Sequence, residues 1–170
     1  LGRLLRLAQS TSGHRSFREV RGPGSGLVLR KRIVQQISGG NPKVDAVMDI
    51  LNAEDRDKRS KVIVWCCFVP DIEAISARLK AEGVNHRTYY GAVDAVNRDA
   101  AVKAFNEDPD MRVMVCNPQT AGEGLNLLGY DYWNDPPKND TYCDTAIFFS
   151  CNWSAIQRAQ AEDRAHRRGT

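Results

Sequence analysis

The sequence predicts an α/β domain with a parallel sheet that is covered by helices on both faces. Two observations support this fold class. Apolar runs of strand length alternate four times with segments of helical periodicity, and a length of 170 residues suits one sizeable hydrophobic core rather than two. Parallel neighbours need crossover connections, and right-handed crossovers place helices on both sides of a sheet.

A basic extension is expected before this domain. Positions 1–40 hold eight basic residues and one acidic residue, whereas the rest of the chain holds sixteen and twenty. Residues 1–9 have apolar side chains at helical spacing, residues 10–26 are rich in Gly, Ser and Arg and favour a mobile loop, and residues 27–37 resume an amphipathic pattern. We therefore expect a helical and loop extension over residues 1–40 that can attract a polyanion, or that is simply solvated.

The compact domain is predicted to span residues 41–170. Asn41 can cap a helix whose first position is Pro42, and the helical pattern continues to residue 54. The elements expected after it are a strand buried on both faces at 61–69, a helix at 71–83, a strand at 86–90, a helix at 93–108, strands at 111–116 and 145–151, and a terminal helix at 154–167.

The five cysteines are predicted to be reduced. They contain no C-x-x-C pair, and only three histidines could join them as metal ligands. Cys66, Cys67 and Cys116 lie in apolar runs and are expected to be buried and free of metal. The longest apolar run, Val62 to Val69, is far shorter than the roughly 18 residues of a membrane span, so we expect no span and no signal peptide, and a place in the cytoplasm, nucleoid or nucleus rather than secretion.

Ligands of parallel sheets bind at the carboxyl ends of the strands. The loop that follows the strand at 111–116 contains Gly122 and Gly124, whose backbone N–H groups could approach a phosphate. A glycine-bearing turn is often purely structural, so this signal is weak by itself. The sequence has no Gly-Lys dipeptide, which excludes a Walker A motif within these residues.

The terminal helix carries a more specific pattern. Gln160, Arg164 and Arg167 are spaced i, i+4 and i+7 and therefore share one helix face. Guanidinium groups at the open end of a parallel sheet suit the binding of phosphate oxygens and the stabilisation of charge that develops on a transferred phosphoryl group. A surface helix with ordinary acidic partners is the alternative that the pattern alone leaves open.

The order of these motifs resembles the second, C-terminal RecA-like lobe of superfamily 2 helicase motors, in particular the Swi/Snf family of DNA-dependent ATPases. KVIVWCCF resembles motif IV, TAGEGLNL resembles motif V, and Asn152-Trp153 followed by QAEDRAHRRG resembles motif VI. The resemblance covers residues 41–170, and motif VI is its most specific part. LLRLAQ in the extension is similar to a helix that precedes this lobe and would brace it.

The resemblance implies roles for individual residues. It implies that the lobe serves double-stranded DNA, and also ATP and Mg²⁺, which are bound mainly by an N-terminal lobe that lies outside these residues. The cysteine pattern and the short apolar runs given above separately predict no metal site and no membrane contact. Arginine fingers would be Arg164 and Arg167, and nucleotide contacts would come from Gln160, Gly122, Glu123 and Gly124. Contacts to the DNA backbone would come from Gly91, Arg98, Thr120, Asn126 and Trp153.

Two other functions remain compatible with the sequence, and one segment is an insertion relative to the family. A lobe of an RNA helicase or another superfamily 2 branch, and a non-enzymatic α/β interaction domain, remain alternatives. Residues 130–143 are about a dozen residues longer than the family's usual connection, and Pro136-Pro137 forbids a regular helix or central strand there. We expect a loop that projects near the nucleic-acid side but off the DNA track, where it is free to gate the track or to meet a protein partner. A surface excursion without function is the alternative.

Overall fold

The computed structural model describes residues 14–19, 31–36, 40–121, 125–134, 136–151 and 158–161. For the first two segments it describes the backbone and its strand pairing, and not the side chains. Contacts divide the chain into two units, residues 1–42 and 43–170, and each unit is described by itself. None of the helices in the described part of the chain has the length and apolar character needed to cross a membrane.

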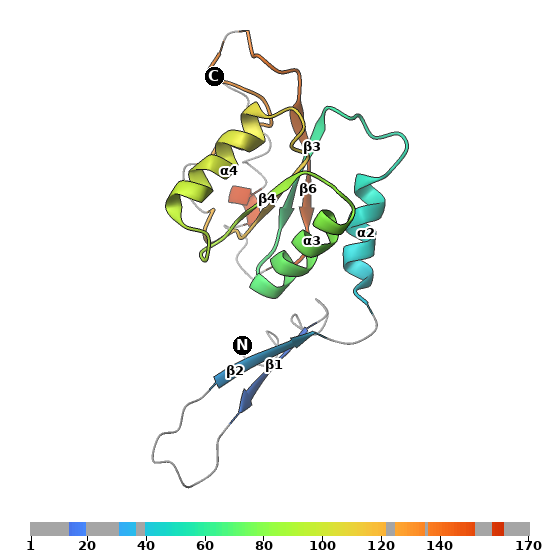
Figure 1. The fold of residues 1–170 in the computed structure, drawn as a ribbon, viewed down its shortest axis with the longest axis vertical. Helices are drawn as coiled ribbons and strands as arrows, with labels where there is room; N and C mark the ends of the chain where they lie inside the picture. Colours follow the sequence, from blue (N-terminus) through green and yellow to red (C-terminus); the bar gives the residue numbers. More distant parts are fainter. Residues whose placement is uncertain are drawn as a thin grey trace. The chain divides into compact units, whose positions relative to one another are not determined.

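Four parallel strands form the sheet of the larger unit, in the order β4-β5-β3-β6. The strands are β3 (Ser60–Trp65), β4 (His86–Tyr89), β5 (Val113–Cys116) and β6 (Tyr142–Phe148). Figure 1 shows β3 and β6 side by side and pointing the same way. The predicted parallel α/β fold is therefore confirmed.

Among the described residues, three helices of ten or more residues cover the two faces of this sheet. They are α2 (Pro42–Leu51), α3 (Val69–Ala81) and α4 (Ala95–Glu107). The apolar stripes of α2 and α3 pack in one core cluster with Val62 and Val64 of β3, and α4 packs in a second cluster with Ile63 and Trp65. Successive residues of β3 thus enter opposite cores, which explains why the strand is a continuous apolar run rather than an alternating one.

Local signals start and end these helices close to the predicted positions. Pro42 is the first residue of α2, and α3 begins at Val69 with a proline in its first turn. Asp94 caps α4, because its Oδ1 accepts a hydrogen bond from the Asn97 N–H at 3.0 Å. Gly83 follows α3 with φ +70°, a left-handed conformation that glycine adopts without strain.

The extension differs from its prediction. Residues 14–19 and 31–36, expected as loop and amphipathic segment, form the antiparallel strands β1 (His14–Glu19) and β2 (Lys31–Gln36). The physical reason is visible in the sequence: Ile33 and Val34 are β-branched, and the Gly-Pro-Gly-Ser-Gly stretch at 22–26 separates two short runs in the manner of a hairpin. The helix expected at residues 1–9 lies outside the described residues.

Strand β6 begins earlier than expected. Tyr142 and Cys143, assigned to the inserted loop from the sequence, pair with Ser60 and Lys61. The register then skips Asp144, an exposed residue, before Thr145 pairs with Val62. Pairing with a buried central strand extends the edge strand into a polar stretch that has no strand signal of its own.

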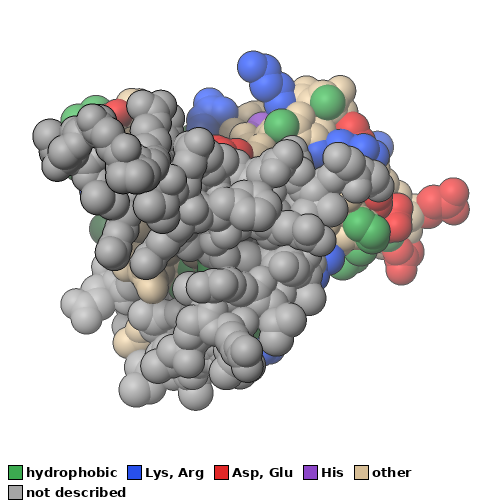
Figure 2. Space-filling model, turned by 90° about the horizontal axis from the view of Figure 1, so that it is seen from below, with side chains coloured by type: hydrophobic (Ala, Val, Ile, Leu, Met, Phe, Trp, Pro, Cys, Tyr) green, Lys and Arg blue, Asp and Glu red, His purple; other side chains and the backbone are tan. Residues whose placement is uncertain are grey.

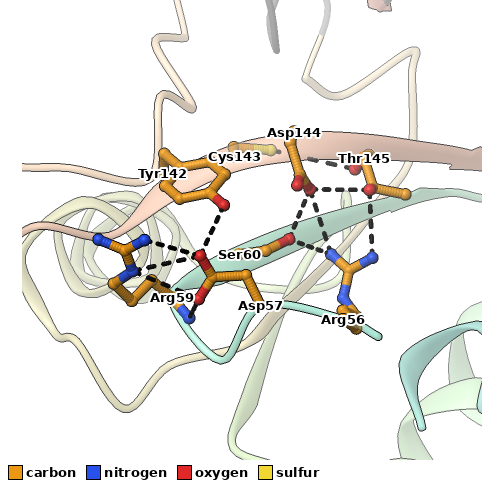
Figure 3. A network of polar contacts seen from close by, with 8 residues as sticks. All are labelled: Arg56, Asp57, Arg59, Ser60, Tyr142, Cys143, Asp144 and Thr145. Carbon is orange, nitrogen blue, oxygen red and sulfur yellow. Dashed lines mark hydrogen bonds and ion pairs between the residues drawn. The ribbon is translucent and has the colours of Figure 1, made fainter. Parts of the chain in front are cut away.

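Polar contacts fix this end of β6 to the segment that precedes β3 (Figure 3). The Arg56 guanidinium donates to Ser60 Oγ, to Asp144 Oδ1 at 3.2 Å and to Thr145 Oγ1 at 3.2 Å. A second group lies beside it, in which Arg59 and the Tyr142 hydroxyl donate to the Asp57 carboxylate at 2.8 and 3.0 Å. These hydrogen bonds hold the pKa of the Asp57 carboxyl well below its usual range.

The inserted loop is anchored at the amino-terminal edge of the sheet. The Asn139 side-chain amide donates to the carbonyls of Asn106 and Glu107 in the last turn of α4, at 2.8 and 3.2 Å. Asn139 Oδ1 accepts from the Asp131 N–H at 3.1 Å, and Asp131 is buried. The exposed positions among the described residues of the loop are Trp133, at 73%, residues 136–138 and Asp140.

The anchors of the inserted loop lie at the edge of the sheet opposite the carboxyl ends of the strands, because α4 runs antiparallel to them. One expectation for the cysteines is wrong. Cys67 was predicted to be buried like Cys66 and Cys116, yet it is only half-buried. It follows β3 in the loop at the carboxyl end of the strand, where it lines a small pocket.

Candidate functional site

The loops at the carboxyl ends of the four strands meet at one edge of the sheet, and this edge is the candidate site. They comprise residues 66–68 after β3, 90–94 after β4, 117–121 after β5 and 149–151 after β6. In Figure 2, which looks from below relative to Figure 1, the coloured surface carries basic and acidic side chains near one another. The visible described surface therefore has mixed charge.

Asn117 organises three of these loops. It is buried, its N–H donates to the Tyr89 carbonyl at 2.9 Å, and its side-chain amide donates to the Cys67 carbonyl at 3.3 Å. Its Oδ1 accepts from the Gln119 N–H at 2.9 Å, and its carbonyl accepts from the Thr120 N–H at 3.2 Å. Asn117 was not singled out from the sequence, although an Asn-Pro dipeptide after a strand is a turn signal.

Gly91 and Thr120 are brought together by this arrangement. A Cβ built on Gly91 would lie 3.8 Å from Thr120 Oγ1, although the two residues belong to loops after different strands. Gly91 is exposed and Thr120 is half-buried. A hydroxyl beside a backbone without a side chain forms a surface that a phosphate oxygen could approach closely.

Arg98 lies in the first turn and a half of α4, close to the same edge. Its guanidinium carbon is 5.7 Å from the centroid of the Tyr89 ring, within the range of a cation–π contact. Tyr89 is buried and its carbonyl receives the Asn117 N–H. The Tyr89 ring and the Asp94-capped turn therefore position Arg98 near the loops that carry Gly91 and Thr120.

Asn126 is not brought to this group. Its backbone carbonyl accepts from the side-chain amide of Asn106 at 2.9 Å, and Asn106 lies in the last turn of α4. Eight helical residues separate Arg98 from Asn106, roughly 12 Å along the axis at 1.5 Å per residue. The predicted DNA contacts thus fall into two places, with Gly91, Arg98 and Thr120 at the carboxyl edge and Asn126 away from it.

Gln160 is exposed on a helical segment, residues 158–161, whose Ala161 is buried in the core cluster of α4. The helical state predicted for this stretch is confirmed for these four residues. The other predicted nucleotide and DNA residues lie outside the described residues: Gly122, Glu123, Gly124, Trp153, Arg164 and Arg167.

Few groups in the described part of the chain have chemistry suited to a metal or to covalent catalysis. Among those residues, no three His, Cys, Asp or Glu side chains come together in a way that could hold a metal ion. Burial raises the pKa of the Cys66 and Cys116 thiols, and raises that of Cys143 to about 12. These three thiols are therefore neutral and poorly nucleophilic at neutral pH.

The family model of the helicase conserved C-terminal domain matches residues 42–135, more than half of the chain. The chain belongs to this helicase C-terminal domain family. The match covers α2 through the start of the inserted loop and includes Gly91, Arg98 and Thr120. The resemblance to the C-terminal lobe of Swi/Snf-type ATPases is confirmed by the relatives.

Curated relatives of this helicase domain are much longer than the chain. An uncharacterized ATP-dependent helicase, MG018 of Mycoplasma genitalium, is 29% identical over 129 residues, which are 76% of this chain and 11% of that protein. The TATA-binding protein-associated factor mot1 of Schizosaccharomyces pombe is 30% identical over 112 residues, 64% of this chain and 5% of that protein. Helicase SWR1 of Mycosarcoma maydis is 25% identical, over 72% of this chain and 6% of its own length.

A solved structure shares the fold of this helicase domain. The crystal structure of the C-terminal part of the Fun30 ATPase domain superposes with a TM-score of 0.61, at 24% identity, over 76% of this chain and 38% of that one. At this identity the likeness establishes the fold, which is the RecA-like α/β fold expected from the sequence.

Proposed function

We propose that the chain is the C-terminal motor lobe of an ATP-dependent translocase of double-stranded DNA. The observation that carries the proposal is the juxtaposition of Gly91 and Thr120 at the carboxyl edge of a helicase-family sheet. Such a motor works where cellular DNA is held, in a nucleus or nucleoid.

DNA is proposed to lie against the carboxyl edge. Gly91 lets a sugar-phosphate backbone come near the main chain, and Thr120 Oγ1 offers a donor 3.8 Å from the position of a Gly91 side chain. Arg98, placed by the Tyr89 ring, adds positive charge near these loops. Contacts of this kind read phosphates rather than bases, so binding should tolerate changes of sequence and weaken with salt. Asn126 and Trp153 would contribute further contacts.

The nucleotide is proposed to be shared with an N-terminal lobe of the same polypeptide. Arg164 and Arg167 would donate to phosphate oxygens and offset the charge that develops during phosphoryl transfer, while Gln160 and the Gly122–Gly124 turn would hold the nucleotide in place. Gln160 is exposed and so can reach a ligand. Bound Mg²⁺ neutralises phosphate charge, and its ligands are assigned to the other lobe, because the described residues here supply no acidic cluster. The 170-residue chain alone should therefore not hydrolyse ATP.

The DNA and nucleotide roles are tested in a protein that contains both lobes. Arg167→Ala should lower ATP turnover about 10³-fold, the low end of an arginine finger's contribution. Gly91→Ala should weaken binding of double-stranded DNA, measured by fluorescence anisotropy, whereas Val96→Ala on the exposed start of α4 should not. Unchanged turnover in Arg167→Ala would favour a non-enzymatic interaction domain, and stronger stimulation by RNA than by DNA would favour an RNA helicase lobe.

The inserted loop is proposed to meet a protein partner rather than DNA. Its exposed part carries Trp133, stacked on Tyr132 with ring centroids 4.5 Å apart, at the edge of the sheet opposite Gly91 and Thr120. Aromatic side chains that are rigid and exposed are common anchors of protein interfaces.

A further inference from the structure

Two thiols and one guanidinium line a small pocket at the ends of β3 and β6. Its walls are made by these residues: Cys67, Pro118, Phe148, Ser150, Cys151, Arg158 and Ala161. Cys67 was expected to be a buried packing residue and Cys151 only to be reduced, and the proposed function uses neither thiol. The pocket differs from the surroundings of Cys66, Cys116 and Cys143, which are buried in the core.

Cys151 is the accessible nucleophile of this pocket. It is exposed, and the Nη1 of Arg158 lies 3.9 Å from its Sγ. The guanidinium is held in this place, because its central carbon lies 4.6 Å from the centroid of the Phe148 ring. A fixed cation beside an exposed thiol attracts anionic reagents to its sulfur.

Cys67 lines the same pocket as Cys151. Its N–H donates to Ser150 Oγ at 2.8 Å, and its Sγ donates to the Ser150 carbonyl at 3.2 Å, so it lies beside the residue that precedes Cys151. Strands β3 and β6 are parallel neighbours whose register pairs Trp65 with Phe148. With strands about 4.8 Å apart and an offset of one residue, the Cα atoms of Cys67 and Cys151 are separated by on the order of 6 Å, within the range of a disulfide. The strand pattern has ended at these residues, and both of them line the same pocket.

We propose that this pocket is a site of thiol–disulfide exchange, in which Cys151 reacts with small anionic disulfides and Cys67 resolves the mixed disulfide. In the first step the Cys151 thiolate attacks one sulfur of the reagent, whose S–S bond breaks and whose other half leaves as a thiolate that takes a proton from water. In the second step the Cys67 sulfur, having lost its proton to water, attacks Cys151 Sγ and releases the second half as a thiol. The two protein thiols are oxidised by two electrons, and the disulfide is reduced to two thiols.

The reaction would link the loops that follow β3 and β6. Both loops lie at the carboxyl edge, so the new bond would restrict this edge of the sheet. Its formation is measured chemically and does not depend on any ATPase activity or DNA binding, so it can succeed or fail independently of the proposed function.

The test is to incubate the reduced chain with glutathione disulfide near neutral pH and follow intact mass and peptide maps with time. The unmodified chain should pass through one glutathionyl adduct on Cys151 to an internal Cys67–Cys151 disulfide, two hydrogens lighter than the reduced chain. Cys151→Ser should form neither product, and Cys67→Ser should accumulate the adduct. Folding of each variant is checked by circular dichroism, and the unfolded chain in denaturant shows that all five thiols can react.

Charge provides a second, independent measurement. Arg158→Gln should slow the first step with glutathione disulfide about fivefold, the effect of one charge roughly 4 Å away in water, and should not slow it with cystamine, a cationic disulfide. The proposal is overturned if Cys151→Ser is oxidised as fast as the unmodified chain, if Cys67→Ser accumulates no adduct, or if Arg158→Gln slows both reagents equally.

Discussion

The Nζ of Lys61 lies 2.8 Å from the backbone carbonyl of Asp108, just beyond the end of α4. The same ammonium group donates to the Phe105 carbonyl at 2.6 Å, and the side chain is completely buried. A lysine of the central strand therefore caps the C-terminal end of a helix on one face of the sheet. Positive charge in this position also complements the helix dipole.

Lys61→Met should destabilise the fold and change its pH dependence. The substitution leaves the carbonyls of Phe105 and Asp108 without their donor, which should cost about 1–3 kcal/mol of unfolding free energy at pH 7. Burial lowers the pKa of Lys61 from 10.5 to about 8, against the attraction of Asp108. Between these values the unfolded lysine is protonated while the folded amine is neutral, so this group makes the unmodified chain more stable as pH rises.

Urea unfolding at pH 7, 8 and 10 measures this effect as a difference between the two proteins. The destabilisation by Lys61→Met should be larger at pH 10 than at pH 8. Buried thiols with raised pKa values lose stability in alkali, but both proteins contain them and their contribution cancels. Lys80→Met, at an exposed position on α3, is the matched control and should show little change at any pH. A pH-independent difference for Lys61→Met would contradict this account.

Gly129 should tolerate no side chain. Its φ is +78°, and a Cβ would lie 2.6 Å from the Cys143 nitrogen and 2.8 Å from the Tyr142 carbonyl carbon. Gly129→Ala therefore combines left-handed strain with a clash against the backbone of β6, and should cost about 2–5 kcal/mol. Gly83→Ala has similar strain, φ +70°, but open space around its Cβ, and should cost only about 1–2 kcal/mol. If Gly129→Ala and Gly83→Ala lower the unfolding free energy equally in chemical denaturation, the clash at Gly129 is relieved and this prediction is wrong.

These features mark the boundary of what the sequence predicts. The elements of the domain follow from local patterns, such as the apolar run of β3 and the Asn41-Pro42 helix start, because each signal lies within a few residues. The start of β6 at Tyr142, the helix cap supplied by Lys61 and the loop contacts of Asn117 depend on partners far along the chain. The residues around a buried lysine or asparagine in the sequence do not indicate which distant groups its side chain will contact.

The candidate site divides in the same way. The family resemblance names Gly91, Arg98, Thr120 and Asn126 one by one, but motif spacing does not say which of them lie together. The structure brings Gly91 to Thr120 and ties Asn126 to the far end of α4 through Asn106. The Tyr89 ring that positions Arg98 has no signal in the sequence beyond its place at the end of a strand.

Arg56 should contribute more to stability than its neighbour Arg59. The Arg56 side chain is 11% exposed and donates to three side chains that join the α2–β3 connection to β6 (Figure 3). Arg56→Met leaves buried Ser60 without this donor and should cost about 1.5–3 kcal/mol. The Arg59 side chain is 54% exposed, so Arg59→Met should barely move the unfolding midpoint. Thermal melts at equal protein concentration compare the two; a larger shift for Arg59→Met would refute the ranking.

The inserted loop should separate into an anchor and a dispensable tip. Asn139 holds the carbonyls of Asn106 and Glu107 and receives the Asp131 N–H, so Asn139→Ala should lower the unfolding free energy by about 1–3 kcal/mol. Replacement of residues 132–138 by a short Gly-Ser link keeps these contacts, and surface loops tolerate changes of length at small cost. The shortened chain should therefore unfold at nearly the same urea concentration as the unmodified one.

In a protein with both lobes, the same replacement of residues 132–138 should leave DNA-stimulated ATPase largely intact. The loop is anchored to the last turn of α4, whereas Gly91 and Thr120 lie at the opposite edge of the sheet. The removed residues include Tyr132 and Trp133, so a protein partner that binds this surface should be lost while DNA binding persists. Trp133→Ser removes the exposed aromatic side chain but keeps the loop length. It therefore shows whether a lost partner depends on the aromatic side chain or on the loop backbone. If the shortened protein stays folded but no longer responds to DNA, the loop belongs to the DNA site and its assignment to a protein partner fails.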